Sequence, residues 1–324
     1  MTNKSVSIII AVKNFNANLK QCIDACLNLD YSDFDILVFP DQEFDYAHDK
    51  VKIIPTGNIT PGKKRNLSLK HTNAEVLAFI DDDAYQVHAW LNNVMPNFED
   101  SLVAAVGGPA ITPNEDNLKQ KASGLIYESL LVSGPSNYRY LPRKKAYVDD
   151  FPSCNFIIRR DVFAELGGFD ENYWPGEDTV LCLRLTKHFN KKIAYEPLAV
   201  IYHHRRPVFK PHLKQINSYA LHRGYFVKRF PETSLRFSYF VPSLFVLYLA
   251  AGIFLKVMPP FLRGFYLAFL SFYCLLVVIF SLQSLRRYPH QFKLIPYVFF
   301  GIIFTHIAYG INFFKGLFSK ELQV

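Results

Sequence analysis

The chain has 324 residues, of which 50% are hydrophobic and 16% aromatic, a high apolar content for a purely soluble protein. Its net charge is +8, but basic and acidic residues nearly balance up to residue 236, and most of the excess lies in the apolar remainder. A nucleic-acid-binding domain would carry that excess itself, so we expect no nucleic-acid partner.

Short apolar runs alternate with helical patterns in the first part of the chain. Residues 6–12, VSIIIAV, form a continuous apolar run rich in β-branched residues, typical of a strand buried on both faces of a sheet. Such alternation favours a mostly parallel sheet in an α/β domain, which we predict over residues 1–205. The predicted elements of its first half are strands at 6–12, 34–40, 51–55, 75–81 and 103–113 and helices at about 19–27 and 64–71.

The later residues change in character. Residues 114–140 mix helical and polar patterns and are interpreted as a variable connection. Residues 154–187 predict a further strand, a helix ending at Gly167–Gly168, and a second helix beginning near Glu177. Residues 206–236 interleave aromatic and basic side chains, which predicts an amphipathic segment at the membrane interface.

The last region, residues 237–324, contains three long stretches that are nearly free of charge. They cover residues 237–258, 264–285 and 294–314. Each has about 20 residues, the length of a helix that spans the hydrocarbon core of a bilayer. We therefore predict about three transmembrane helices and a multi-pass protein of the cell inner membrane.

Basic residues set the predicted orientation. Arg286, Arg287 and Lys293 cluster between the second and third stretches, so the positive-inside rule predicts a cytoplasmic N-terminal domain. Three spans would then carry the end of the sequence to the far side, although Lys315 and Lys320 argue against this. The five cysteines agree with a reducing compartment, and the opening residues are not expected to form a signal peptide.

Three consecutive carboxylates, Asp81, Asp82 and Asp83, follow the predicted strand at 75–81. They repel one another, so a divalent cation is an obvious compensating charge. Carboxylate oxygens suit Mg²⁺ or Mn²⁺, and Asp81 and Asp83 lie on the same side of an extended segment. Taken alone, the run is equally typical of a solvated acidic loop.

Two further groups lie near predicted strand ends or helix starts. Lys63, Lys64 and Arg65 begin a predicted helix, where backbone N–H groups favour anions such as phosphate, although a solvated basic helix start gives the same pattern. Asp41 ends a strand and is a candidate hydrogen-bond acceptor for a base or ribose, or a turn residue.

Carboxylates and aromatic residues also meet near the last predicted helix of the domain. Glu177 and Asp178 fit ordinary helix capping. They also fit a second role, in which a carboxylate takes the proton from the hydroxyl of an acceptor substrate. Tyr173 and Trp174 just before them resemble a sugar-stacking platform, which predicts acceptor binding.

Histidines offer two more candidate sites. His203 is a candidate metal or phosphate ligand, and its neighbour His204 shares the pattern, although paired histidines before arginines also occur on basic surfaces. In the third apolar stretch, His306 is interpreted as a neutral residue bonded to a neighbouring helix.

These motifs occur in a recognisable order: KN after the first strand, Asp41, GKKRN, FIDDD, CNFIIRRDVFAELGGFDE and GEDTVLCLRL. The ordered set resembles family 2 glycosyltransferases of the Rossmann-like GT-A fold over about residues 5–205. The resemblance implies an inverting transfer of a sugar from a nucleotide-diphosphate donor that depends on Mg²⁺ or Mn²⁺.

The resemblance also implies roles for individual residues. Asp178, with Glu177 beside it, would be the general base, and Asp81 and Asp83 would form an Asp-x-Asp metal pair. The residues expected at the nucleotide sugar are Asp41, Lys63, Arg65, Asn66, Asp81 and Asp82.

The sequence departs from the family pattern at three points. Ala11 stands where the family often has proline. VFPDQ replaces the common VDDGS around Asp41, which leaves the nucleobase open, and Gln215 is not followed by Arg-Trp, which argues against a processive polysaccharide synthase. The predicted membrane lipid contacts favour a lipid-linked or glycan acceptor, such as polyprenyl phosphate. The alternatives are a non-catalytic sugar-nucleotide-binding or scaffolding subunit and a channel with a regulatory domain; whether the chain forms an oligomer stays open.

Overall fold

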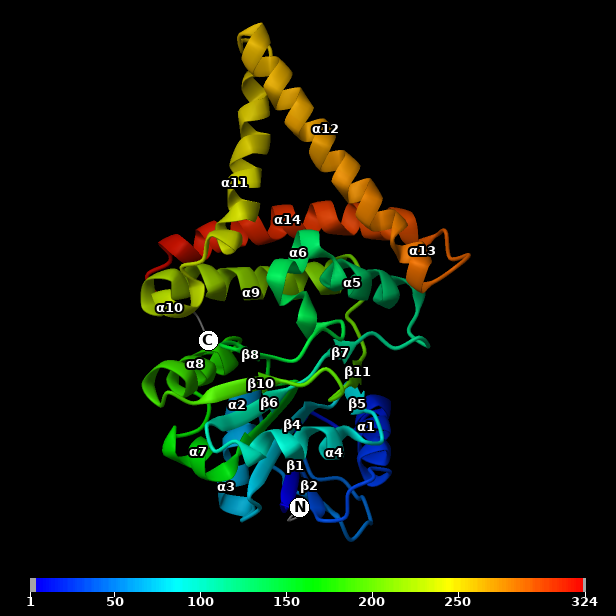
Figure 1. The fold of residues 1–324 in the computed structure, drawn as a ribbon, viewed down its shortest axis with the longest axis vertical. Helices are drawn as coiled ribbons and strands as arrows, with labels where there is room; N and C mark the ends of the chain where they lie inside the picture. Colours follow the sequence, from blue (N-terminus) through cyan, green and yellow to red (C-terminus); the bar gives the residue numbers. More distant parts are fainter. Residues whose placement is uncertain (1–3, 323–324) are drawn as a thin grey trace. The chain divides into compact units, whose positions relative to one another are not determined.

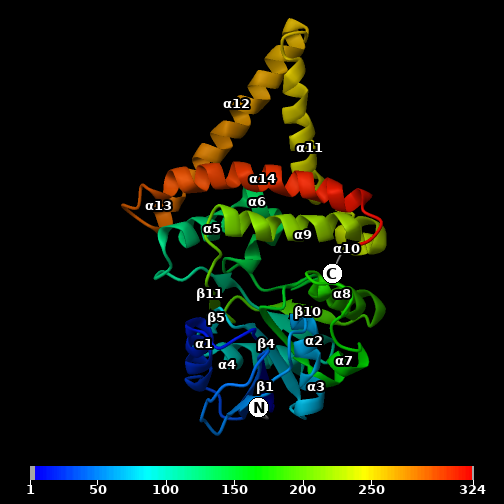
Figure 2. The same cartoon turned by 180° about the vertical axis from the view of Figure 1, so that it is seen from behind.

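The computed structural model describes residues 4–322, which form two compact units. The first unit contains residues 4–111 and 138–204, and the second contains residues 112–137 and 205–322 (Figures 1 and 2). Residues 112–137 therefore belong to the same unit as the C-terminal helices. The α/β domain predicted from the sequence, residues 1–205, had included them.

The first unit is an α/β domain. Its elements are β1 (Val6–Ala11), α1 (Ala17–Leu27), β2 (Phe34–Phe39), β3 (Val51–Ile53), α2 (Pro61–Asn66), α3 (Ser68–His71), β4 (Val76–Asp81), β5 (Ala84–Gln86), α4 (Trp90–Val94), β6 (Val103–Gly107), β7 (Ala110–Ile111), β8 (Ala146–Val148), β9 (Asn155–Arg159), α7 (Arg160–Glu165), α8 (Glu177–Leu183), β10 (Lys192–Tyr195) and β11 (Ile201–His203).

Eight of these strands form the main sheet in the order β3-β2-β1-β4-β9-β6-β10-β8, and a smaller sheet has the order β5-β11-β7. Strands β3, β2, β1 and β4 are mutually parallel, as are β6 and β10, while β9 runs antiparallel between β4 and β6. The predicted mostly parallel α/β sheet is confirmed. β9 was predicted as a strand, but its antiparallel direction and the small sheet were not predicted.

Both faces of the main sheet are buried, which explains the unbroken apolar run of β1. Ile8 and Ile10 pack in the cluster that includes residues of α1 and α4, whereas Ile9 packs in the opposite cluster with residues of α7 and α8. Successive side chains of a strand point to opposite faces, so a strand covered on both sides has no polar face.

Parallel pairing also brings several strand ends to one edge of the sheet. Ala11 of β1 pairs in register with Phe39 of β2 and Asp81 of β4, so the loops that follow these strands begin side by side. In open α/β sheets, ligands bind beyond this edge. The candidate site residues that follow β2 and β4 therefore lie on the expected side of the sheet.

The second unit is all helical. It includes helices long and apolar enough to cross a membrane at Phe237–Phe254, Pro260–Arg287 and Leu294–Phe318, matching the three apolar stretches. The elements of this unit are α5 (Leu118–Glu128), α6 (Leu130–Ser133), α9 (Lys210–Arg229), α10 (Pro231–Ser234), α11 (Phe237–Ala251) continued by the turn η4 (Gly252–Phe254), α12 (Pro260–Leu282), α13 (Ser284–Arg287) and α14 (Leu294–Phe318).

His306 of α14 is bonded on both ring nitrogens. Its Nε2 lies 2.9 Å from the carbonyl oxygen of Leu131, and its Nδ1 lies 2.9 Å from the hydroxyl of Tyr273 on α12. Because a carbonyl only accepts, Nε2 donates there and Nδ1 accepts from the tyrosine. The prediction of a histidine bonded to a neighbouring helix is confirmed, and the geometry gives His306 a structural role.

Candidate active site

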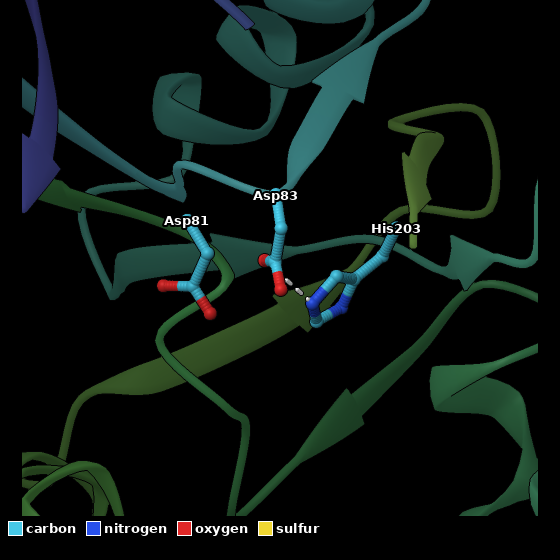
Figure 3. Close-up of side chains that lie close together, drawn as sticks. All are labelled: Asp81, Asp83 and His203. Atoms are coloured by element: carbon cyan, nitrogen blue, oxygen red, sulfur yellow. Dashed lines mark ion pairs between the residues drawn. The ribbon is translucent and has the colours of Figure 1, made fainter. Parts of the chain in front are cut away.

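Asp81, Asp83 and His203 converge at the end of β4. One carboxylate oxygen of each aspartate and one imidazole nitrogen of the histidine all lie within 4.8 Å of one another. Figure 3 shows the carboxylate of Asp83 beside the His203 ring, with Nε2 and Oδ1 2.9 Å apart. All three residues are partly exposed, so the group is open to solvent and to a ligand.

The two sheets explain why His203 reaches the aspartates and His204 does not. β11 pairs antiparallel with β5, with His203 opposite Ala84, the residue after Asp83. Adjacent residues on an extended strand point to opposite sides, and the Nε2 of His204 lies 2.9 Å from Oε1 of Gln21 instead. Of the paired histidines, only His203 joins the acidic group.

Arg65 connects Asp81 to Glu177. Its Nη2 donates to Oδ1 of Asp81 at 2.7 Å, and its Nη1 donates to Oε1 of Glu177 at 3.2 Å. The guanidinium is almost fully buried, and Nε has no hydrogen-bond partner among the described residues. The protein therefore supplies part of the positive charge that the crowded aspartates require, from a residue at the end of α2.

Glu177 is buried at the first position of α8. Burial is the main cause that raises its pKa to about 7; the neighbouring Asp178 raises it further, and Arg65 lowers it. Gly176, just before it, has a φ of +121°, which L side chains rarely adopt, and donates its N–H to Oε2 of Glu177 at 3.0 Å. The Gly-Glu-Asp sequence thus fixes the orientation of the glutamate.

Asp178 is less buried than Glu177. Its Oδ1 accepts from the N–H of Thr179 at 2.7 Å, and its Oδ2 accepts from the N–H of Ser153 at 3.4 Å. The carboxylate is therefore oriented by backbone donors while part of it remains accessible, an arrangement suited to a group that meets a substrate.

Asp82 contacts the start of α1 and is not one of the three residues that converge at the end of β4. Its Oδ2 accepts from the side-chain amide of Asn16 at 3.1 Å. Burial and then the charge of Asp83 raise the pKa of Asp82 to about 6, while Asn16 lowers it. Asn16 also caps α1 through Leu19, so one short loop supports both the helix and the acidic turn.

The other predicted donor-binding residues have protein partners. Lys64 is buried and donates to the carbonyl of Val12 at 2.6 Å and to the carboxylate of Asp41. The Nζ of Lys63 lies 3.7 Å from Oε2 of Glu171, and both side chains are exposed to solvent. Asp41 therefore sits beside β1 with its charge neutralised, and its role toward a nucleobase stays a prediction.

Asn66 holds a loop of its own domain. Its amide donates to the carbonyl of Phe169 at 2.9 Å and accepts from the N–H of Phe169 at 2.8 Å. The same loop region continues to Tyr173, which is half-buried, and Trp174, which is 48% exposed. A contact of Asn66 with nucleotide stays a prediction; its structural contact is with the loop that precedes Glu177.

The ion pairs of Arg65 and the contact of Asn16 were not predicted from the sequence. Arg65 was predicted to bind phosphate because it lies near the start of a helix. Residues 65 and 177 are far apart in the sequence and come together only in the folded domain, so no sequence motif predicts their contact. The one sequence signal for such a contact was the run of carboxylates, because their negative charge requires a cation nearby.

Comparison with known proteins fits this geometry. The family model described as Glycosyl transferase family 2 matches residues 7–167, about half of the chain. The chain belongs to this family. The resemblance inferred from the ordered motifs is therefore confirmed. The match to the family model runs from β1 to the residues just after α7.

A solved structure shares the fold of this chain. A mannosyltransferase from Pyrobaculum calidifontis, solved with GDP-Man and Mn²⁺, is 15% identical, has a TM-score of 0.57, and covers 98% of this chain and 88% of its own. At this identity the likeness shows the fold, a GT-A sheet domain followed by helices.

Two curated relatives match by sequence. The pre-mycofactocin glycosyltransferase of Mycobacterium tuberculosis is 26% identical over 209 residues, 63% of this chain and 44% of the relative. The glucosyl-dolichyl phosphate glucuronosyltransferase of Haloferax volcanii is 21% identical over 217 residues, 61% of this chain and 68% of the relative. The chain thus spans less than half the length of the mycobacterial relative.

Proposed function

We propose that this family 2 protein transfers a sugar, with inversion, from a nucleoside-diphosphate donor to an acceptor hydroxyl or phosphate at the cytoplasmic face of the inner membrane. The observation that carries the proposal is the convergence of Asp81, Asp83 and His203 within 4.8 Å, linked through Arg65 to Glu177. A cation-binding group joined to a second acidic group suits a reaction that needs both a neutralised leaving group and a base.

The donor atoms of the acidic group fit a divalent cation. Two partly exposed carboxylates and one imidazole match the ligands that Mn²⁺ accepts, and the exposure leaves positions for phosphate oxygens. When bound, such a cation neutralises the diphosphate as it leaves. Asp81, Asp83 and His203 would hold the cation. The ion pair with Arg65 would fix the orientation of the Asp81 carboxylate.

Asp178 is the better candidate for the general base, in place of the more buried Glu177. Its carboxylate is oriented by backbone donors and is partly accessible, whereas Glu177 is buried and paired with Arg65. In the proposed reaction Asp178 accepts the proton of the acceptor hydroxyl. Glu177 maintains the position of α8 relative to α2, and the exposed Trp174 nearby offers a face for the acceptor sugar.

The acceptor is proposed to be lipid-linked. Three long apolar helices support membrane association, and the Haloferax relative is, by its name, an enzyme of a dolichyl phosphate-linked sugar. A soluble domain tethered to the bilayer meets lipid-linked acceptors at high effective concentration. A polyprenyl phosphate or a polyprenyl-linked glycan fits this geometry.

The test is donor turnover by the purified full chain in nanodiscs that contain membrane lipid extract and Mn²⁺. Release of UDP or GDP is measured with a panel of nucleotide sugars for the wild type, Asp83→Asn and Asp178→Asn. We expect each substitution to reduce turnover at least about 100-fold, because Asp178→Asn removes the proposed base and Asp83→Asn removes a proposed ligand of the cation. Glu165→Gln, on the exposed surface of α7, is the matched control and should leave turnover unchanged.

Full turnover by Asp178→Asn would contradict its role as base. A wild-type protein that binds UDP or GDP but consumes no donor with any acceptor would instead support a non-catalytic binding subunit. Both outcomes are distinguishable from misfolding because the melting temperature of each variant is measured in the same nanodiscs.

A further inference from the structure

The third apolar helix, α14, packs lengthwise against the polar helix α9. A Cβ added to Gly224 of α9 would lie 2.1 Å from the carbonyl oxygen of Phe313, and one added to Gly316 of α14 would lie 1.9 Å from that of Leu221. The backbones of the two helices are therefore in direct contact, and Figures 1 and 2 show them side by side.

Polar contacts extend this pairing along most of α14. His212 bonds to Thr305 at 2.9 Å, Asn312 donates to Asn217 at 2.9 Å, and Lys228 donates to the carbonyl of Ser319 at 2.7 Å. The positions increase together on both helices, so the helices run parallel. From Thr305 to Ser319 the contact covers about 21 Å of helix axis.

α9 is too charged to lie in hydrocarbon. Its 20 residues include five lysines and arginines and no acidic residue, and its polar side carries exposed cations. Each such cation in the centre of a bilayer is costly, whereas a basic amphipathic helix is stable in the headgroup layer. A helix that stays in contact with α9 over this distance cannot stand across the bilayer unless α9 does too.

The α11–α12 hairpin has a different direction from α14. Figures 1 and 2 show α11 and α12 rising away from α14, which runs crosswise at their base. Ser243 of α11 donates to the carbonyl of Gly310 at 2.9 Å, and Tyr273 of α12 is bonded to His306. Both helices of the hairpin therefore contact α14. At 1.5 Å per residue, α12 extends about 34 Å, enough to cross a hydrocarbon core of about 30 Å.

The side of α14 away from α9 carries a stripe of exposed apolar residues. Phe300, Phe304, Ile311 and Phe318 are 49%, 42%, 40% and 77% exposed and are spaced by four or seven positions. This spacing puts them on one face of the helix. The stripe is long and aromatic, which suits the upper hydrocarbon layer of a bilayer.

We propose that α14 lies in the plane of the membrane, with this stripe in the acyl region and α9 in the headgroup layer, and that only α11 and α12 cross. The chain then has two crossings, and Lys320 is on the same side as α9. Lys315 and Lys320 join the basic residues of α9 on that side, while the hairpin tip carries Lys256 and Arg263. This arrangement removes the conflict that three crossings create with the positive-inside rule. The proposal does not depend on sugar transfer.

Cysteine labelling of the full chain in sealed membrane vesicles tests the number of crossings. The partly exposed Cys154 and Cys274 are replaced by serine, and the buried Cys22, Cys26 and Cys182 are kept. Single cysteines are then introduced as Lys320→Cys, Val257→Cys at the hairpin tip and Glu165→Cys on α7, and each is labelled with a membrane-impermeant maleimide.

We expect Lys320→Cys and Glu165→Cys to label from the same side and Val257→Cys from the opposite side. Labelling of Lys320→Cys together with Val257→Cys would indicate three crossings and overturn the proposal. Labelling of all three from one side would show that the hairpin does not cross, and would overturn it as well.

A depth measurement tests the orientation of α14 independently. Nitroxide labels at Phe300→Cys, Ile311→Cys and Phe318→Cys are compared by oxygen and nickel accessibility in lipid nanodiscs. An in-plane helix gives nearly equal depths, whereas a spanning helix separates the first and last labels by about 27 Å. A clear gradient of depth would contradict the proposal. Labels shielded from oxygen would mean that another protein chain covers the stripe, and would contradict it too.

Discussion

Arg65 forms an ion pair with Glu177, Nη1 to Oε1 3.2 Å, across 112 positions of the chain. The same guanidinium binds Asp81 at 2.7 Å. One buried cation thus links the acidic group at the end of β4 to the start of α8. This link holds the two parts of the candidate site together before any ligand binds.

Removal of Arg65 is expected to destabilise the domain. Arg65→Met leaves Glu177 buried without its partner and Asp81 without one of its donors, so we expect unfolding free energy to fall by about 3 kcal/mol. Thermal melting of the purified protein measures the change. Lys70→Met on the exposed side of α3 is the control, with an expected effect within about 0.5 kcal/mol. Equal melting temperatures for the two variants would contradict the role of Arg65.

The paired histidines are expected to differ in Mn²⁺ binding. His203→Ala removes the proposed ligand atom that lies beside Asp83, so the Mn²⁺ dissociation constant should rise at least about 10-fold. His204→Ala removes a residue bonded to Gln21 and should leave the constant unchanged. Electron paramagnetic resonance of free Mn²⁺ gives both constants. Equal losses in the two variants would contradict the assignment of the ion to His203 and not to His204.

Glu177 is expected to make stability depend on pH. Its pKa is raised by burial from 4.5 to about 7 in the folded protein, so the folded state binds a proton that the unfolded state has released between these values. Its stabilising contribution is therefore full below pH 4.5 and is lost as the pH rises through 7, a change on the order of 3 kcal/mol.

The substitution Glu177→Gln should remove this dependence. Melting curves of wild type and Glu177→Gln are compared at pH 5 and pH 7.5, and the variant should gain stability relative to wild type at the higher pH. Glu165→Gln, on the exposed surface, should track the wild type at both values. A constant difference between wild type and Glu177→Gln would mean that Glu177 stays ionised throughout.

Trp174 is expected to affect the acceptor and not the cation. Its ring is 48% exposed in the loop before Glu177, so Trp174→Ala should raise the acceptor KM about 10-fold while kcat and Mn²⁺ affinity stay within two-fold. Tyr147→Ala, an exposed aromatic residue on β8, is the control. A fall in kcat with unchanged KM would assign Trp174 to a different step.

The strong periodic signals in the sequence were sufficient for the main elements. The β-branched run of β1 and the apolar run ending at Asp81 predicted buried parallel strands, because strands covered on both faces lack polar positions. The antiparallel β9 was predicted as a strand, but its direction depends on pairing with β4 and β6, which are distant in sequence.

The candidate site was predicted in composition and only partly in geometry. Asp81, Asp83 and His203 were named from the sequence, and the fold brings them together through the pairing of β5 with β11. The pairs Arg65–Glu177 and Lys64–Asp41 were not foreseen, since side chains that look like phosphate ligands at a helix start are equally able to neutralise nearby carboxylates. Only the packed structure shows which lysine or arginine each acid meets.

Calorimetric titration of GDP and UDP into the purified full chain, with and without Mn²⁺, tests the central claim most directly. We expect at least one nucleotide to bind only when Mn²⁺ is present, with binding lost in Asp83→Asn. Asp82→Asn, whose side chain points toward Asn16, should keep the Mn²⁺ dependence. Binding of equal strength without Mn²⁺, or undiminished Mn²⁺-dependent binding by Asp83→Asn, would contradict the claim that this acidic group holds a cation for a nucleoside diphosphate.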